Sequence, residues 1–420
     1  MSDYFEFPKV LEDIIYGYVA DYTLYDNKGN AYYCNNDDDI SHLRNIKITK
    51  IVAYRTFIIT ETVKNILFYI GNNIKEIIGN VTCVGDMSNL FAWSTFDQDI
   101  DHWDMSAVTN MSRMFNYSRF NHPIGNWDVS SVTNMRRMFA HALFNQDISN
   151  WNVSSVTDMI GMFGNSHFNH PICNWNVSSV INMSYMFAQS RFNQDISNWN
   201  VSNVTNMSDM FVRSKFDQPI GSWNVSNVTD MNHIFSYSNF NQDISNWDVS
   251  SVTNMSSMFI YSHFNQPIGN WNVSYVTDMS GMFFNAIFFN KDISKWDTSS
   301  VKNMGSMFMY SKNFNQNIGG WNVKNVKYMD HMFSDAESFN QNIGNWDVSN
   351  VTKITYMFGN AKKFNQDISK WKLSNVEDLT GLFYGASSFN QNINVWSTGH
   401  IKCMTDMFIN SGMKTLPNWY

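Results

Sequence analysis

Apolar and polar residues recur along the chain with a period of 24 or 25 residues from Phe96 onward. Residues 240–263, FNQDISNWDVSSVTNMSSMFIYSH, are one copy, and each copy carries a Phe, an Ile, a Trp and a Met–Phe pair at fixed places. The residues between these positions are mostly Asn, Ser, Asp and Gln. Such a repeat is typical of a solenoid, in which each coil buries its apolar side chains against its neighbours.

Tryptophans give the register of the repeat and predict a structural ladder through thirteen coils: Trp103, Trp127, Trp151, Trp175, Trp199, Trp223, Trp247, Trp271, Trp296, Trp321, Trp346, Trp371 and Trp396. Their spacing is 24 residues up to Trp271 and 25 afterwards, and the extra residue always falls between the Met–Phe pair and the next Phe–Asn. A length change tolerated at one place predicts a loop there. The two Met columns accept only Ile or Leu as replacements, which indicates core packing rather than metal binding.

Each coil is predicted to contain a short helix and a short parallel strand, so the fold class is an α/β solenoid similar to a leucine-rich repeat. Apolar residues at 252, 255, 258 and 259 have the spacing of one face of a helix of two to three turns. The other half, residues 240–249, is too short and polar for a helix and predicts a strand stacked on those of adjacent coils. The Asn after the opening Phe is expected to be buried and to satisfy backbone groups between coils.

Over the first eight coils the residue before the fixed Ile alternates between Asp and Pro, for example Asp243 and Pro267. Gly or Cys follows the Ile in the Pro type, and Ser follows it in most of the Asp type. The older unit of duplication is therefore about two coils long. Because Pro cannot donate to a strand ladder, this position is expected at a strand edge.

Residues 1–85 do not repeat and predict an α+β region that covers the front of a solenoid at residues 86–411. Residues 7–19 predict an amphipathic helix, and residues 22–25 and 31–34 predict strands on either side of a turn. Residues 46–60 predict strand, whereas residues 62–78 fit either a helix or a pair of strands. After Met407–Phe408 the pattern stops, so residues 412–420 are predicted to cap the rear, where Pro417 prevents addition of a strand.

Composition narrows the classes of function. The chain is 44% hydrophobic and 15% charged with a net charge of -8, and it has no cluster of Lys and Arg, so nucleic acid is not expected as a partner. Its four cysteines are scattered, which argues against a disulfide framework or a zinc site. No run of about 20 apolar residues predicts a membrane span, and the N-terminus lacks a secretory pattern. An intracellular location is therefore expected, with a virion as a further possibility.

No enzyme site is predicted. None of the ten histidines has a Cys, a Ser or a second His at a fixed spacing, and paired acids such as Asp243 and Asp248 recur as features of the repeat. We therefore expect neither catalysis nor a cofactor or metal.

Variable positions near the Met–Phe pair are predicted to bind a protein partner, because aromatic residues and Arg are common anchors of interfaces. The predicted partner-binding residues are Arg113, Arg136, Arg137, Tyr185, His233, Tyr237, Tyr261, Tyr310, His331 and Tyr356. A solvated repeat surface is the alternative interpretation of any single one.

The coil F-N-Q-D-I-S-N-W-D-V-S-N-V-T-N-M-S-x-M-F-x-x-A/S resembles the BspA-type leucine-rich repeats of mycoplasma surface proteins, other bacterial surface proteins and large DNA viruses. The resemblance covers about residues 86–411 and implies a leucine-rich-repeat-like solenoid with a role in interactions. Bacterial members usually carry a signal or a lipoprotein cysteine, and this sequence shows neither. A structural virion or cell-surface protein is an alternative function.

Residues 7–19 resemble the start of an F-box, although Phe7 stands where that family prefers Leu. This likeness implies a second alternative, a substrate receptor of a ubiquitin ligase. The residues that would then face the ligase adaptor are Pro8, Leu11, Ile14, Ile15 and Val19. In the other interpretation these residues belong to an amphipathic helix that faces the first coil.

Overall fold

The computed structural model describes residues 20–35, 43, 46–54, 56–70 and 74–420. The chain forms two compact units. The first unit comprises Met1–Val180 and Ser190–Gln194, and the second comprises Ile181–Gln189 and Asp195–Tyr420. The helix predicted at residues 7–19 lies outside the described residues.

The first unit begins with the predicted hairpin. β1 (Tyr22–Asp26) pairs antiparallel with β2 (Ala31–Cys34), which confirms both strands. The turn is fixed by the Asp26 carboxylate, which accepts the backbone N–H groups of Lys28 and Asn30 at 2.8 Å each.

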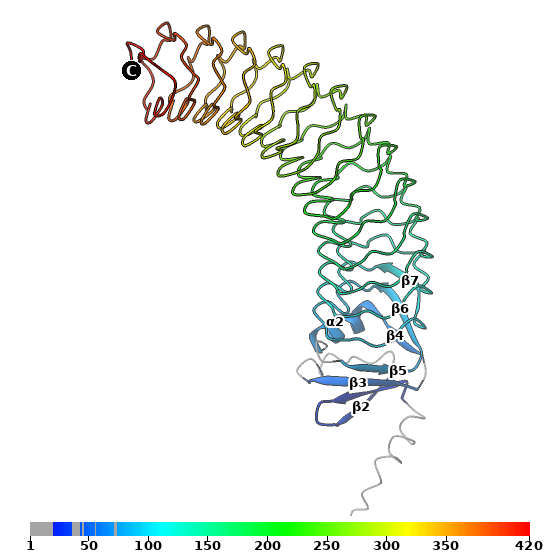
Figure 1. Ribbon diagram of the computed structural model, residues 1–420. Coiled ribbons are helices and arrows are strands. Elements are labelled where there is room, and N and C mark those ends of the chain that lie inside the picture. Colours follow the sequence, from blue (N-terminus) through cyan, green and yellow to red (C-terminus); the bar gives the residue numbers. More distant parts are fainter. Residues whose placement is uncertain (1–19, 36–42, 44–45, 55, 71–73) are drawn as a thin grey trace, which may run out of the picture. The chain divides into compact units, whose positions relative to one another are not determined.

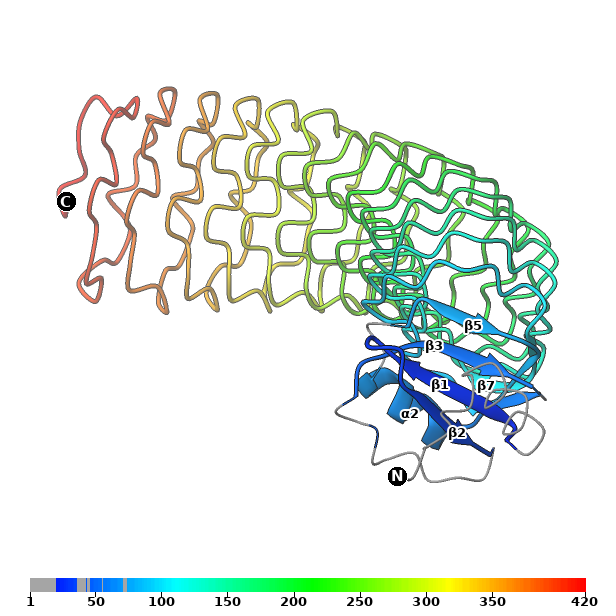
Figure 2. The same cartoon turned by 90° about the horizontal axis from the view of Figure 1, so that it is seen from below.

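Two sheets and one helix complete the non-repeating region. β3 (Ile48–Ala53) lies between β1 and β5 (Glu76–Ile78), which gives the order β2-β1-β3-β5 (Figure 2). A second sheet contains β4 (Phe57–Ile59), β6 (Val81–Asp86) and β7 (Asp104–Asn110), with β6 between the other two (Figure 1). α2 (Glu61–Ile70) precedes β5, so the stretch that fitted either a helix or two strands is a helix followed by a strand.

α2 is held against the start of the repeat by a partly buried ion pair. The Lys64 ammonium lies 3.2 Å from the Asp86 carboxylate and 3.3 Å from the Ser88 hydroxyl. Residues 87–94 then form half of a coil, in which Phe91 stacks on Phe96 with ring centroids 4.4 Å apart. The apolar core of the repeat therefore begins before the first complete coil.

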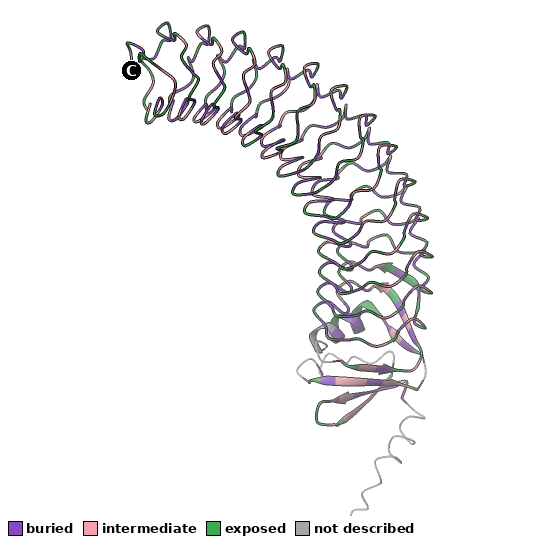
Figure 3. Cartoon of the chain, viewed as in Figure 1, coloured by how far each residue is buried: buried purple, intermediate pink, exposed green. Residues whose placement is uncertain are grey.

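The columns that repeat in the sequence form the core of each unit. Phe240, Ile244 and Met255 have no solvent exposure, and Figure 3 shows buried and exposed residues alternating along the coils. The indole N–H of Trp247 donates to the Ile220 carbonyl of the preceding coil at 3.0 Å, and Trp151 and Trp321 donate in the same way, whereas the buried indole N–H of Trp103 in the first coil has no partner among the described residues. The tryptophan ladder thus joins coils through hydrogen bonds as well as through packing.

The helix predicted in each coil is wrong. Among the described residues of the repeat no α-helix is present, and the Met–Phe half consists of consecutive turns. The N–H of Met258 donates to the Met255 carbonyl of its own coil at 3.3 Å, whereas the N–H of Phe259 donates to Met282 of the next coil at 2.9 Å. An α-helix would keep both groups inside the coil, so neighbouring coils could not be hydrogen-bonded through this half.

The strand predicted in residues 240–249 is also wrong in position. Parallel backbone pairing occurs instead in the half predicted to be helical, for example between Asn254 and Asp278. Residues 240–249 are joined to the next coil by side chains, because the Asn241 amide oxygen accepts the Asn265 N–H at 2.9 Å. The predicted role of the Asn column is confirmed, whereas the expected burial is wrong, because these side chains lie at the surface.

The loop predicted at the extra residue is confirmed. In a 24-residue coil the Ser262 hydroxyl accepts the Phe264 N–H at 3.2 Å. In a 25-residue coil the added residue closes a backbone turn, in which the Phe289 N–H donates to the Ala286 carbonyl at 3.0 Å. The hydroxyl is then no longer needed, and Ala takes the place of Ser in most of the longer coils.

The C-terminal residues keep part of the repeat pattern. The indole N–H of Trp419 donates to the Ile393 carbonyl at 3.1 Å, and its ring stacks on Trp396 with centroids 6.1 Å apart. Trp419 therefore adds a member to the tryptophan ladder, which the sequence pattern had ended at Trp396. Pro417 is buried next to it.

Candidate functional site

Each coil has two tight turns in its Met–Phe half, and the residues at their tips are exposed or half-buried in most coils. In the coil that contains Phe259 these residues are Ser257 and Tyr261, with φ values of 55° and 53°. Left-handed backbone costs a residue with a side chain roughly 1–2 kcal/mol. The backbone hydrogen bonds to the next coil, at 2.8 Å from both residues, hold this conformation.

The same two positions have positive φ in every coil and form two columns, which we call the turn face of each unit. The first column contains Asn89, Arg113, Arg137 and Gly161 in the first unit, and Tyr185, Asp209, His233, Ser257, Gly281, Ser306, His331, Tyr356, Gly381 and Asp406 in the second. The second column contains Trp93, Tyr117, His141 and Asn165, and then Gln189, Arg213, Tyr237, Tyr261, Asn285, Tyr310, Asp335, Asn360, Gly385 and Asn410. All described residues other than Gly with positive φ belong to these columns.

The structure brings the predicted partner-binding residues into these columns, within each unit. The first column holds Arg113, Arg137, Tyr185, His233, His331 and Tyr356, and the second holds Tyr237, Tyr261 and Tyr310. Arg136 precedes the first column by one residue and lies 4.0 Å from Asp158. Variable positions that were separate in sequence are therefore consecutive in space within each unit.

An aromatic run follows the second column of the second unit. The Arg213 guanidinium lies 4.8 Å from the Tyr237 ring centroid, and Tyr237 stacks on Tyr261 at 4.8 Å. Phe284, one residue before the column, continues the run between Tyr261 and Tyr310. The guanidinium over an aromatic face and the consecutive ring contacts restrain these side chains, so the run forms an ordered surface that is both apolar and polar.

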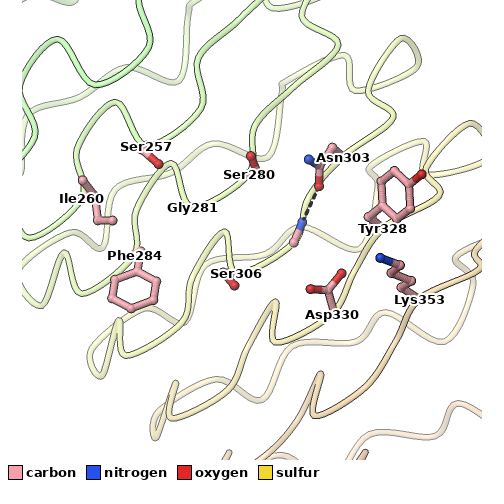
Figure 4. A pocket seen from close by; sticks show the side chains of 11 residues that line it. Ser257, Ile260, Ser280, Gly281, Phe284, Asn303, Ser306, Tyr328, Asp330 and Lys353 are labelled. Carbon is pink, nitrogen blue, oxygen red and sulfur yellow. Dashed lines mark hydrogen bonds between the residues drawn. The ribbon is translucent and has the colours of Figure 1, made fainter. Parts of the chain in front are cut away.

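Beside this run, small residues leave a shallow hollow of about 500 Å³ (Figure 4). Its floor follows the first column where that column holds Ser257, Gly281 and Ser306. Asp330 and Lys353 lie at one side, where the Lys353 ammonium is 5.4 Å from the Tyr328 ring centroid. The hollow offers hydroxyl groups, a carboxylate and an ammonium, which suit polar contacts with a partner.

Two titratable groups of the turn face have shifted pKa values. Burial raises the pKa of the Asp209 carboxyl, an effect that a hydrogen bond from Tyr185 opposes. Burial, together with the nearby positive charge of Arg137, lowers the pKa of His141.

Sequence reasoning missed Trp93 and the hollow. Trp93 lies 24 residues before Tyr117, so extending the repeat register by one half-coil would have found it. The hollow depends on small residues in three consecutive coils, which a search for large anchors passes over.

The described part of the chain contains neither a group of metal ligands nor a membrane-spanning helix. Among those residues no group of three or more His, Cys, Asp or Glu could hold a metal ion. Likewise, none of the helices in that part is long and apolar enough to cross a membrane.

Comparison with known families decides the relationship of the chain. The family described as "Mycoplasma protein of unknown function, DUF285" matches residues 85–194, 143–242, 236–337, 260–363 and 315–419. The chain belongs to this family. The predicted likeness to mycoplasma repeat proteins is thereby confirmed, and the DUF285 matches together span residues 85–419.

A solved structure is also similar to this DUF285 chain. It is a leucine-rich repeat protein from Eubacterium ventriosum, with 11% sequence identity and a TM-score of 0.38. The similarity covers 89% of this chain and 92% of that one. No curated protein matches the chain, and none of the matches indicates a catalytic family.

The residues predicted to face a ligase adaptor, from Pro8 to Val19, lie outside the described residues. The F-box likeness therefore stays a prediction.

Proposed function

We propose that this DUF285 protein is a non-enzymatic, protein-binding repeat protein that holds its partner on the turn face of its coils. One observation supports this most strongly. The positions that vary between coils, and that carry Arg, His and Tyr, are those at the left-handed turns, where the Arg and most of the Tyr side chains are exposed and the His side chains of the second unit are half-buried. The repeated residues are used for packing, so the variable tips are the places where one coil differs chemically from the next.

The test compares a turn-face variant with a matched control. Tyr237→Asn combined with Tyr261→Asn removes two rings and keeps the backbone, because Asn occupies the same turn position at Asn285 and Asn360. Tyr275→Ser is the control, since Tyr275 is 67% exposed, lies outside the turn face and replaces a Ser found in other coils.

Proteins captured from a lysate by the unchanged chain should lose at least tenfold in recovery with the double variant and be retained by Tyr275→Ser. Equal recovery by all three proteins would contradict a role for the turn face of the second unit. We also propose that the protein acts inside a cell, which fractionation and microscopy would test.

A further inference from the structure

The turn face of the first unit carries a stack of three exposed rings. Trp93 and Tyr117 lie 3.8 Å apart with an interplanar angle of 7°, and Tyr117 and His141 lie 4.1 Å apart at 5°. Trp93 is 59% exposed and Tyr117 is 41% exposed. The stack is therefore a surface feature, separate from the buried Trp and Phe ladders.

The backbone holds these rings in register. The N–H groups of Trp93, Tyr117 and His141 donate to the next coil at 2.8, 2.9 and 2.8 Å. All three residues have positive φ, between 57° and 61°. A ligand that stacks on this surface would meet rings already fixed in place, so little side-chain entropy would be lost on binding.

One end of the stack is open. At the other end, the Asn165 amide donates to His141 Nδ1 at 2.8 Å. Among the described residues no ring stacks on the outer face of Trp93. The stack therefore has room for one further planar group on Trp93. Ring stacking there would contribute about 0.5–1.5 kcal/mol beyond the effect of the buried area.

Arginines flank the stack. Arg113 and Arg137 occupy the first column of the turn face in the two coils that hold Tyr117 and His141, and both are exposed. No carboxylate of the described residues lies within ion-pair distance of either guanidinium, whereas Arg136 is close to Asp158. The positive charge of Arg137 acts on the stack, because it helps to lower the pKa of His141.

We propose that this surface binds an acidic peptide segment that carries an aromatic side chain. The aromatic ring stacks on Trp93, and carboxylates bind Arg113 and Arg137 in bidentate pairs. Coils lie about 4.8 Å apart and an extended peptide rises about 3.3 Å per residue. The aromatic ring lies one step beyond Trp93, so Arg113 and Arg137 are about two and three coils from it, and the acidic residues lie within about five positions of the aromatic one, before or after it. This proposal rests on the proposed protein-binding function and adds the chemistry of the partner.

The geometry favours a peptide over a single-stranded nucleic acid. Nucleic-acid surfaces stack successive bases on several open rings along a positive groove. Here the rings cover one another and leave one open face. The chain also has a net charge of -8, which opposes a polyanion.

The test selects peptides from a random display library with the full chain. Two variants run in parallel, Trp93→Asn and the double variant Arg113→Gln with Arg137→Gln. Asn and Gln both occupy turn positions with positive φ, at Asn165 and Gln189, so the backbone is preserved. Arg119→Gln is the matched control, because Arg119 is an exposed arginine of the same coil as Arg113 and lies outside the turn face.

Enriched peptides should carry an aromatic residue with two Asp or Glu residues within about five positions, before or after it. Their affinity, measured by fluorescence anisotropy, should fall at least tenfold in each variant, stay unchanged in Arg119→Gln and weaken as salt rises. Trp93→His keeps a smaller ring and should lose less affinity than Trp93→Asn, which separates stacking from misfolding.

Three results would overturn the proposal. Enriched peptides could lack the acidic and aromatic pattern, or bind the variants as tightly as the unchanged chain. An oligothymidine could bind more tightly than any selected peptide, which would assign the surface to nucleic acid. If partner proteins are lost with the Tyr237 and Tyr261 variant while Trp93→Asn has no effect on any ligand, the proposed function stands and this inference fails.

Discussion

At the scale of single residues, close approach between coils explains why certain positions hold Gly. A Cβ added to Gly125 would lie 2.9 Å from the Asp147 carbonyl oxygen of the next coil, and Gly221 faces Asp243 in the same way. Both glycines follow the Pro–Ile pair, and both carbonyls belong to the Asp type of coil. Glycine after the fixed Ile thus allows a close fit to the carbonyl of the next coil.

Gly319 and Gly320 allow this fit to be tested within one coil. Gly319→Ala should lower the free energy of unfolding by about 1–3 kcal/mol, because the new methyl would collide with the Asn342 carbonyl. Gly320→Ala should change it by less than about 0.5 kcal/mol, since no atom lies within 4 Å of the added carbon. Urea unfolding followed by tryptophan fluorescence measures both, and equal losses would contradict the packing argument.

Acid sensitivity is a second property set by single residues. The Ser245 N–H donates to the Asp243 carboxylate at 2.9 Å, and this bond, with one from the Ser245 hydroxyl, lowers the pKa of Asp243. Asp147, Asp195, Asp292 and Asp367 have pKa values lowered by equivalent bonds. A carboxyl with a lowered folded-state pKa stabilises the fold above its ordinary pKa, near 4, and this contribution is lost as the pH falls through the lowered value.

Replacing these five Asp residues with Asn should therefore reduce the loss of stability below about pH 4. Asn keeps the hydrogen bond without titrating, as Asn317 does with the Gly319 N–H at 3.1 Å. The midpoint of thermal unfolding, measured from pH 7 to pH 3, should fall less steeply in the variant than in the unchanged chain. Parallel curves would show that these carboxylates do not carry the acid sensitivity.

At the scale of elements, the turn after the Met–Phe pair depends on coil length. Ser262→Ala should cost about 1–3 kcal/mol, because it leaves the buried Phe264 N–H without an acceptor. Ser311→Ala, in a longer coil, removes the bond from the Ser311 hydroxyl to the Phe283 carbonyl but does not leave that carbonyl unpaired, because it keeps the Ala286 N–H as a donor. It should therefore cost less, since the Phe314 N–H still donates to the Ser311 backbone carbonyl at 3.0 Å. Urea unfolding and hydrogen exchange of the two amides distinguish the two variants. Equal losses of stability would contradict the idea that a backbone carbonyl replaces the Ser hydroxyl as acceptor in the longer coils.

The same scale shows where prediction from sequence succeeded and failed. The register, the buried columns, the Asn ladder and the loop followed from strict recurrence, because a position that stays apolar in every coil must be packed in every coil. The choice between helix and turns did not follow. The apolar side chains point inward in either structure, as those of Val252, Met255, Met258 and Phe259 do. The φ angles of Ser257 and Tyr261 determine whether the segment forms a helix or turns. Gly, Asn or Asp stands at these positions in many other coils, for example Gly281, Asn285 and Asp335, and these residue types favour a left-handed backbone, so the columns carried a sign that the helix prediction passed over.

In the non-repeating region, too, the feature with a local sequence signal was predicted and the contact between distant residues was not. The hairpin had a local signal, a polar turn between Tyr-rich strands, and was predicted correctly. The parallel pairing of β3 with β5 joins residues 26 positions apart, Lys50 and Glu76 for example, and no local pattern specifies such a contact. The turn face was predicted as a set of variable residues, whereas its arrangement in two columns required the structure.

At the scale of the whole molecule, each coil is stabilised mainly by its neighbours. Phe259 is fully buried and stacks on Phe235 and Phe283 of the adjacent coils, at 5.9 and 5.7 Å. Phe259→Ala should therefore weaken two interfaces at once and cost about 3–5 kcal/mol. Because repeat proteins unfold by nearest-neighbour coupling, we expect the single urea transition of the unchanged chain to split into two. A single transition, merely shifted, would indicate longer-range coupling.

The hydrogen bonds of the turn half also have a direction. Met255, Ser257, Phe259 and Tyr261 all donate their N–H groups forward to the following coil, and the coils of each unit repeat this arrangement. The peptide dipoles of this half therefore add along the stacking axis, as they do along an α-helix. A coil inserted in the opposite direction would place N–H groups against N–H groups. An array of this kind can therefore lengthen only by tandem duplication that keeps the direction of the coils.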